Sequence, residues 1–129
     1  GPLPGATVGE QRRRGLRMLT SDEFAAEHPD LIDMLVSQRE RNPTSLPTFK
    51  AQFEAILNSD RSQLVAKIEA PTLVIHGALD PLIPAHNGRL LSQRIAGAQF
   101  ELLEGCGHLP HLEKPVETAA LIREFLAQT

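Results

Sequence analysis

The pattern of apolar and polar positions changes character near residue 67. Before that point, apolar residues recur at the three- and four-residue spacing of one helix face, as in the pair Phe49 and Phe53. Cap residues and prolines bound three predicted helices, over 23–27, 30–42 and 47–57. Because no predicted strand separates these helices, their apolar faces need a surface outside this segment on which to pack.

From residue 67 onward, short apolar runs alternate with helical spacing. The pattern predicts a strand over 71–76, a helix over 84–96 with Pro84 in its first turn, a strand over 99–103 and a helix that Pro115 opens. Short loops between them imply a parallel pair joined by a right-handed crossover. The continuous apolar run 71–76 is typical of a strand buried on both faces. Two parallel strands make a marginal sheet, so this α/β unit is predicted to be the end of a larger one.

Composition narrows the class of protein and its partners. A chain of 129 residues with 41% hydrophobic and 22% charged residues suits one small globular domain. A net charge of −3 and a pI near 5.9 argue against a nucleic-acid partner, and no apolar run approaches the roughly 18 residues of a membrane span. The single cysteine, Cys106, excludes an internal disulfide, and with no signal peptide in view we expect a cytoplasmic protein.

An acidic residue follows the first predicted strand. Asp80 stands in the segment His76-Gly77-Ala78-Leu79-Asp80-Pro81, just beyond the strand's carboxyl end, where open α/β sheets place their sites. A carboxylate held there can accept a proton of a histidine ring and select the tautomer of that ring. The alternative is an aspartate that only satisfies backbone groups of the turn before the next helix.

A histidine follows the second predicted strand in the same way. His108 lies in a loop with Gly105 and Gly107, which can adopt positive φ and bring the imidazole over the sheet edge. A lone loop histidine is usually a surface or packing residue. Adjacent parallel strands lie about 4.8 Å apart, however, so side chains just past their ends are within reach of each other. The pairing of His108 with Asp80 is therefore the feature that indicates chemistry.

These two segments resemble a known family. The run from Ala70 through Asp80 to Pro84 is similar to the acid loop of α/β-hydrolase-fold enzymes, and the run from Gly105 through His108 to Pro115 is similar to their histidine loop. The resemblance implies that Asp80 is the catalytic acid, that His108 is the catalytic base and that no cofactor is needed. Residues 8–66 are similar to the helical cap of enol-lactonases, esterases and cofactor-free haloperoxidases.

The family's nucleophile elbow, Gly-x-Ser-x-Gly, has no counterpart in this chain. None of the serines stands between a predicted strand and helix with flanking glycines: Ser21, Ser37, Ser45, Ser59, Ser62 and Ser92. We therefore expect a C-terminal portion of an α/β-hydrolase. Residues 1–66 would form the helical cap segment, with 1–7 a tag or a disordered start, and residues 67–129 would form the C-terminal part of the core.

The resulting hypothesis is a fragment of a serine-type hydrolase that acts on an ester, lactone or similar bond of a small molecule. The fragment would supply the acid and the histidine, would be inactive alone, and would form a homo-oligomer or associate with the missing N-terminal half. One alternative is a non-catalytic self-associating module on a hydrolase-derived scaffold. Another is a parent with cofactor-free haloperoxidase chemistry or with an aspartate nucleophile.

Other reactive side chains have simpler interpretations. His111 lies three residues after His108, but no further ligands converge to make a metal site, so no metal is expected. His76 ends a strand and is expected to form a local hydrogen bond. Cys106 is not expected to be a nucleophile, because the resemblance places the family's nucleophile elsewhere. A short basic run in an acidic chain is usually a solvated face, and this applies to Arg12, Arg13 and Arg14. His28 and His86 are expected at the surface.

Overall fold

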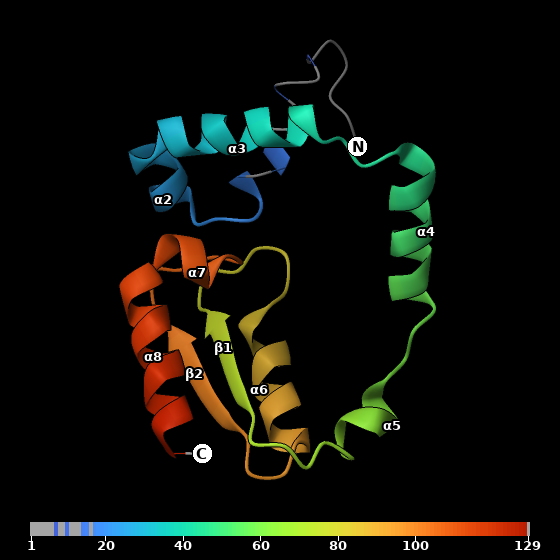
Figure 1. Ribbon diagram of the computed structural model, residues 1–129, viewed down its shortest axis with the longest axis vertical. Helices are drawn as coiled ribbons and strands as arrows, with labels where there is room; N and C mark the ends of the chain where they lie inside the picture. The colour runs from blue at the N-terminus through green and yellow to red at the C-terminus, as the bar shows by residue number, and fades with distance from the viewer. Residues whose placement is uncertain (1–6, 8–9, 11–13, 16, 129) are drawn as a thin grey trace.

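Two parallel strands form the centre of the C-terminal half of the protein. The structure is a computed structural model, and it describes residues 7, 10, 14–15 and 17–128. β1 (Leu73–Gly77) pairs in parallel with β2 (Gln99–Leu103). The crossover helix α6 (Ala85–Arg94) and the terminal helix α8 (Pro115–Gln128) both contact β1, and Figure 1 shows the strand pair between them. The predicted strand–helix–strand–helix order is confirmed.

The predicted burial of the first strand is wrong. Residues Leu73 to His76 are only half-buried, and Gly77 alone in β1 is buried. The reason is the size of the sheet, which has two strands in the described part of the chain, so neither strand has neighbours on both edges. A smaller difference concerns Pro84, which is the N-cap of α6 rather than part of its first turn.

Helices make up the N-terminal half, as the apolar spacing predicts. α2 (Asp22–Glu27) and α3 (Pro29–Arg41) pack against each other, and the side chain of Ser21 caps α2 by accepting the N–H of Phe24. Their small core is made of Ala25, Ile32 and Val36, with Leu19 and Leu35 against it. Ile32 and Val36 are four residues apart, so they share one helix face, and neighbouring Met34 consequently faces outward.

α4 (Leu46–Leu57) forms where the sequence predicts it but buries none of its residues. Ser45 caps its first turn by accepting the N–H of Thr48. Phe49 and Phe53 stack on each other with ring centroids 6.2 Å apart, yet their exposed fractions are 58% and 51%. Figure 1 shows α4 standing away from the sheet, and its large apolar residues are all more than half exposed: Leu46, Phe49, Phe53, Ile56 and Leu57.

Two four-residue helices, α5 (Ser62–Val65) and α7 (Pro110–Glu113), are additional to the predicted elements. Such short turns carry too few apolar positions for a periodic signal. α7 lies beyond the carboxyl ends of the strands, between the sheet and the pair α2 and α3 (Figure 1). None of the helices described is both long and apolar enough to cross a bilayer. The prediction of a tag or disordered start over 1–7 concerns residues that, apart from Thr7, lie outside the described part.

Candidate active site

Asp80 occupies the turn between β1 and α6, and its two carboxylate oxygens have different partners. Oδ1 accepts the backbone N–H groups of Leu82 and Ile83, both at 2.9 Å. Oδ2 lies 2.8 Å from Nδ1 of His108. Asp80 therefore satisfies the backbone of its turn and contacts the histidine at the same time, so both roles considered from sequence coexist in one side chain.

His108 follows β2 and meets Asp80 at the carboxyl edge of the sheet. An ionised carboxylate can only accept, so Nδ1 of His108 must carry the proton of this hydrogen bond, which leaves Nε2 as the available basic nitrogen. The side chain of Asp80 is 3% exposed and that of His108 is 33% exposed. A buried acid thus orients a ring that remains accessible from outside.

The environment of Asp80 favours its charged form. Burial by itself would raise the pKa of this carboxyl. The N–H of Ile83, the ring of His108 and the N–H of Leu82 all donate to it, and together they hold its pKa below the ordinary aspartate value. Asp80 is therefore an anion near neutral pH, as an acid that stabilises an imidazolium must be.

A second histidine, His76, borders the same carboxylate. Its Nε2 lies 2.9 Å from the carbonyl oxygen of Ile83, which can only accept, so that nitrogen carries a proton. The same nitrogen lies 3.3 Å from Oδ2 of Asp80. The local hydrogen bond expected from sequence is present, and the additional proximity to Asp80 arises because the turn folds back over the strand end.

Glycines let the two loops approach each other. A Cβ atom on Gly77 would overlap the carbonyl oxygens of Gly107 and Cys106, so only glycine fits there. Gly105 has φ +62° and supplies the predicted left-handed turn, whereas Gly107 has a negative φ and is needed for space instead. The N–H groups of Ala78 and Leu79 donate to the carbonyls of Leu103 and Cys106, at 2.9 and 2.8 Å, and so join the acid loop to the histidine loop.

The other reactive side chains lie elsewhere or are inert. Cys106 is fully buried, and burial, reinforced by the negative charge of Glu113, raises the pKa of its thiol to about 11, which disfavours a nucleophilic role. His28, His86 and His111 are exposed. Arg14 is exposed as well, while Arg12 and Arg13 lie outside the described residues. Within the described part, no group of three or more His, Cys, Asp or Glu side chains is arranged to hold a metal ion.

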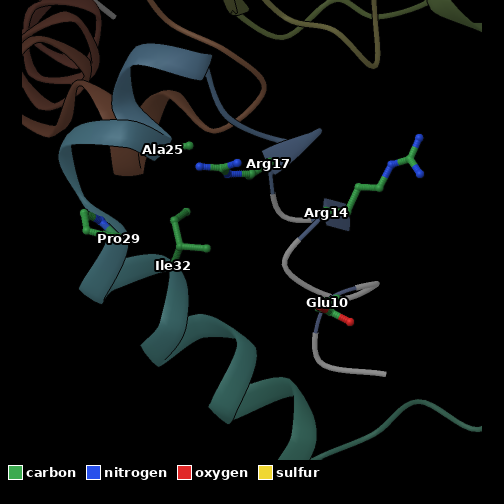
Figure 2. Close-up of a pocket in the computed structure, with 6 residues that line it drawn as sticks. All are labelled: Glu10, Arg14, Arg17, Ala25, Pro29 and Ile32. Atoms are coloured by element: carbon green, nitrogen blue, oxygen red, sulfur yellow. The ribbon is translucent and has the colours of Figure 1, made fainter. Parts of the chain in front are cut away.

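Two cavities differ in their relation to the Asp80–His108 pair. A cavity of about 430 Å³ lies between α3 and α7, beside the histidine loop, and is lined by Leu35, Gln38, Arg39, Asn42, Leu109, His111 and Leu112. A second, of about 390 Å³, is lined by Glu10, Arg14, Arg17, Ala25, Pro29 and Ile32. Figure 2 shows Arg17 directed toward Ala25 in this second cavity, whereas Arg14 points away. Neither Asp80 nor His108 lines either cavity, but Leu109, the residue after His108, lines the first.

Sequence reasoning missed one polar residue near the site. Glu113, the last residue of α7, is 8% exposed and accepts hydrogen bonds from backbone N–H groups on both sides of His108. A glutamate at the end of a four-residue helix reads as a surface residue from sequence. The only available signal is its spacing of five residues from His108 in a loop rich in glycine and proline.

A parallel strand–helix–strand unit that holds an aspartate and a histidine at its carboxyl edge is the arrangement of an α/β hydrolase. A model of the alpha/beta hydrolase fold family matches residues 17–115 of this chain. The chain therefore belongs to the alpha/beta hydrolase fold family, as the two loop segments predict. The match includes both strands and both side chains of the candidate site.

Curated relatives and solved structures agree on this fold. The chain is 43% identical over 65 residues to a monoacylglycerol lipase of Homo sapiens, covering 50% of this chain and 19% of the relative. A monoacylglycerol lipase of Xenopus laevis is 28% identical over 126 residues, covering 98% of this chain and 37% of the relative. The solved enol-lactonase from Burkholderia xenovorans LB400 matches with a TM-score of 0.81 at 24% identity, covering 91% of this chain and 44% of that chain.

A serine hydrolase involved in carbazole degradation matches the whole chain, with a TM-score of 0.77 at 21% identity, but only 51% of its own length is covered. At this level of identity the two structural matches show the fold alone. The chain spans about half of these solved structures and a smaller share of the two lipases.

Proposed function

We propose that this chain supplies the catalytic acid and histidine of a serine-type α/β-hydrolase that cleaves an ester, lactone or similar bond of a small molecule. The observation that carries this proposal is the 2.8 Å contact between Nδ1 of His108 and Oδ2 of the buried Asp80. Family membership and the hydrolase names among the relatives support it. No cofactor is required for this chemistry.

In this proposal His108 acts through Nε2. The ring takes the proton of a serine hydroxyl as the serine oxygen attacks the substrate carbonyl, and it then protonates the departing alkoxide. In the second half, it takes a proton from water as the water oxygen attacks the acyl-enzyme, and returns that proton to serine. Asp80 stays ionised throughout, holds the Nδ1–H tautomer and stabilises the transient imidazolium.

The nucleophile is proposed to come from a segment outside this chain. The serines considered in the sequence analysis include residues with a structural role instead: the side chains of Ser21 and Ser45 cap helices α2 and α4. In this proposal residues 1–66 form a cap segment over the core of residues 67–129. The cavity between α3 and α7 would then receive an apolar part of the substrate, because Leu35, Leu109 and Leu112 line it.

The test compares the chain with the longer protein that this proposal requires, expressed from the reading frame that encodes the chain. We expect the longer protein to hydrolyse a short-chain nitrophenyl ester and to react covalently with a fluorophosphonate, and we expect both activities to be lost in its His108→Ala variant. The 129-residue chain alone should show neither activity. Turnover by the chain that vanishes in His108→Ala would contradict an external nucleophile, whereas a longer protein with neither activity would contradict the serine mechanism. An aspartate at the nucleophile position would instead favour the dehalogenase or epoxide-hydrolase alternative.

A second candidate, a self-associating module without catalysis, is favoured by the exposed apolar face of α4 and by the open edges of the two-stranded sheet. Association and catalysis need not exclude each other, because the same face could be covered by a second copy or by further chain. A small-molecule substrate remains the partner that the family resemblance implies, and the expectation of no nucleic-acid or membrane partner still rests on composition. The cytoplasmic location also stays a prediction.

A further inference from the structure

The backbone around His108 is held from two directions. The N–H groups of Gly107 and Leu109, the residues before and after the histidine, donate to the carboxylate of Glu113, at 3.0 and 3.4 Å. The N–H of His108 itself donates to the carbonyl of Leu19, at 3.1 Å. Three consecutive N–H groups at the candidate base are thus all engaged by acceptors outside residues 107–109.

Glu113 also reaches the segment that precedes α2. Its Oε2 accepts the N–H of Ser21 at 2.8 Å as well as that of Gly107, so one oxygen joins residues that are far apart in the chain. The approach is close enough that a Cβ atom on Gly107 would lie 2.6 Å from the nitrogen of Ser21 and 2.9 Å from Oε1 of Glu113. The backbone of residues 107–109 is therefore clamped between Glu113 of α7 and the segment that precedes α2.

A carboxylate is suited to this clamp and an amide is not. A buried charge is costly unless several donors compensate it, and charge-assisted hydrogen bonds are stronger than neutral ones. The three hydrogen-bond partners of Glu113 named above are all backbone N–H donors, which match a group that only accepts. Glutamine would keep one acceptor oxygen but would turn its NH₂ toward one of these N–H groups.

We propose that Glu113 is a positioning residue for His108: it fixes the backbone on both sides of the histidine and makes the orientation of the ring depend on the docking of residues 19–21. The catalytic part of this inference rests on the proposed function. Glu113 acts through the loop backbone, which sets where the Nδ1–H of His108 points relative to Asp80.

The test is NMR of the isotope-labelled 129-residue chain. The readouts are the downfield resonance of the His108 Nδ1 proton and amide hydrogen exchange, with unfolding curves recorded in parallel. Asp80→Asn serves as the reference for loss of the ring hydrogen bond. The matched control is Thr118→Val, which removes the bond from Oγ1 of buried Thr118 to the carbonyl of Pro110 at the start of α7 and leaves the hydrogen bonds of Glu113 and of residues 107–109 in place.

In folded Glu113→Gln we expect the Nδ1 proton resonance to shift toward that of Asp80→Asn and to broaden. Amide exchange at Ser21 and Gly107 should accelerate by on the order of tenfold or more, the effect of losing a hydrogen bond to a charged group. Thr118→Val should lose stability yet keep both signals. Glu113→Ala should shift the Nδ1 proton resonance and accelerate amide exchange by more than Glu113→Gln does. If Glu113→Ala does not fold, the result for Glu113→Gln decides the question.

A Glu113→Gln chain that is destabilised but keeps the wild-type ring resonance and the slow exchange at Gly107 would overturn the proposal and leave Glu113 a purely structural residue. These readouts require no turnover. The proposed function is tested separately by hydrolysis and fluorophosphonate labelling of the longer protein, so the two can fail independently.

Discussion

The backbone of Gly77, at the end of β1, lies directly against the carbonyl oxygen of Gly107, the residue before His108. This contact joins the strand that leads to the acid with the loop that carries the histidine. Since neither position has room for a side chain, the distance between Asp80 and His108 is set by backbone packing as well as by their own hydrogen bond.

Gly77→Ala should therefore destabilise the fold by about 1–3 kcal/mol or more, because a methyl group would be forced into backbone atoms that have little freedom to move. Chemical unfolding would measure the loss, and the His108 ring resonance should move with it. Gly15→Ala is the control, since nothing lies within 4 Å of a Cβ atom there. Equal stability of the two variants would contradict the packing argument.

In the longer protein that the proposed function requires, Asp80→Asn should lower the rate of acylation by up to about 10⁴-fold while the protein remains folded, because the amide disfavours the ring tautomer that leaves Nε2 free. Single-turnover hydrolysis of a nitrophenyl ester measures this step. An active protein whose Asp80→Asn variant acylates at nearly the normal rate would remove Asp80 from the catalytic machinery.

The lowered pKa of Asp80 predicts that the folded state loses stability at acidic pH. Burial raises its pKa, but the N–H of Ile83, the ring of His108 and the N–H of Leu82 lower it by more, so the folded state favours the ionised carboxyl. The resulting stabilisation is complete above the ordinary carboxyl pKa of about 3.9 and is lost as the pH falls through the lower pKa of the folded state. Urea unfolding between about pH 5 and about pH 2 should show this loss in the wild type.

Two variants make the acid measurement specific. Asp80→Asn should have a flatter pH dependence over the same range, because it has no carboxyl at this position to protonate. Glu124→Gln removes a carboxyl from an exposed position on α8 and should follow the wild type. Parallel curves for the wild type and Asp80→Asn would show that the hydrogen bonds to this carboxylate contribute no pH-dependent stability.

Cys106 should be unreactive in the folded chain. Its thiol is fully buried and, with a pKa raised to about 11, almost wholly protonated near neutral pH. Alkylation by iodoacetamide at about pH 8 should be slower than in the guanidinium-unfolded chain by at least about a hundredfold. Comparable rates in the two states would mean that the thiol is accessible and that the histidine loop opens readily.

The chain should associate at micromolar concentration. Phe49 and Phe53 on α4 are more than half exposed, and they stand beside further exposed apolar residues of the same helix. Sedimentation should detect a dimer or larger species, and the double variant Phe49→Ser, Phe53→Ser should shift it toward the monomer. Met34→Ser, at an exposed apolar position on α3, is the control. A wild-type chain that sediments as a compact monomer would contradict association.

The sequence by itself determines the features that depend on neighbours along the chain. Helical spacing, caps such as Ser21 and Ser45, and the strand–helix–strand alternation all act within a few residues, so the element order and the placement of Asp80 and His108 after successive strands follow from local pattern. The parallel pairing follows from loop length and handedness, which bring both strand ends to one edge.

Only the tertiary structure decided which groups that are distant in the sequence form hydrogen bonds to the same carboxylate. The division of the Asp80 oxygens between its turn and His108, the proximity of His76, and the clamp of Glu113 on Ser21 and Gly107 each require segments that no local pattern relates. Burial is equally non-local: the apolar run of β1 predicts a strand enclosed on both faces, but a two-stranded sheet leaves it half-buried. Hydrogen bonding and burial depend on what the whole fold brings together, and periodicity along one segment does not contain that information.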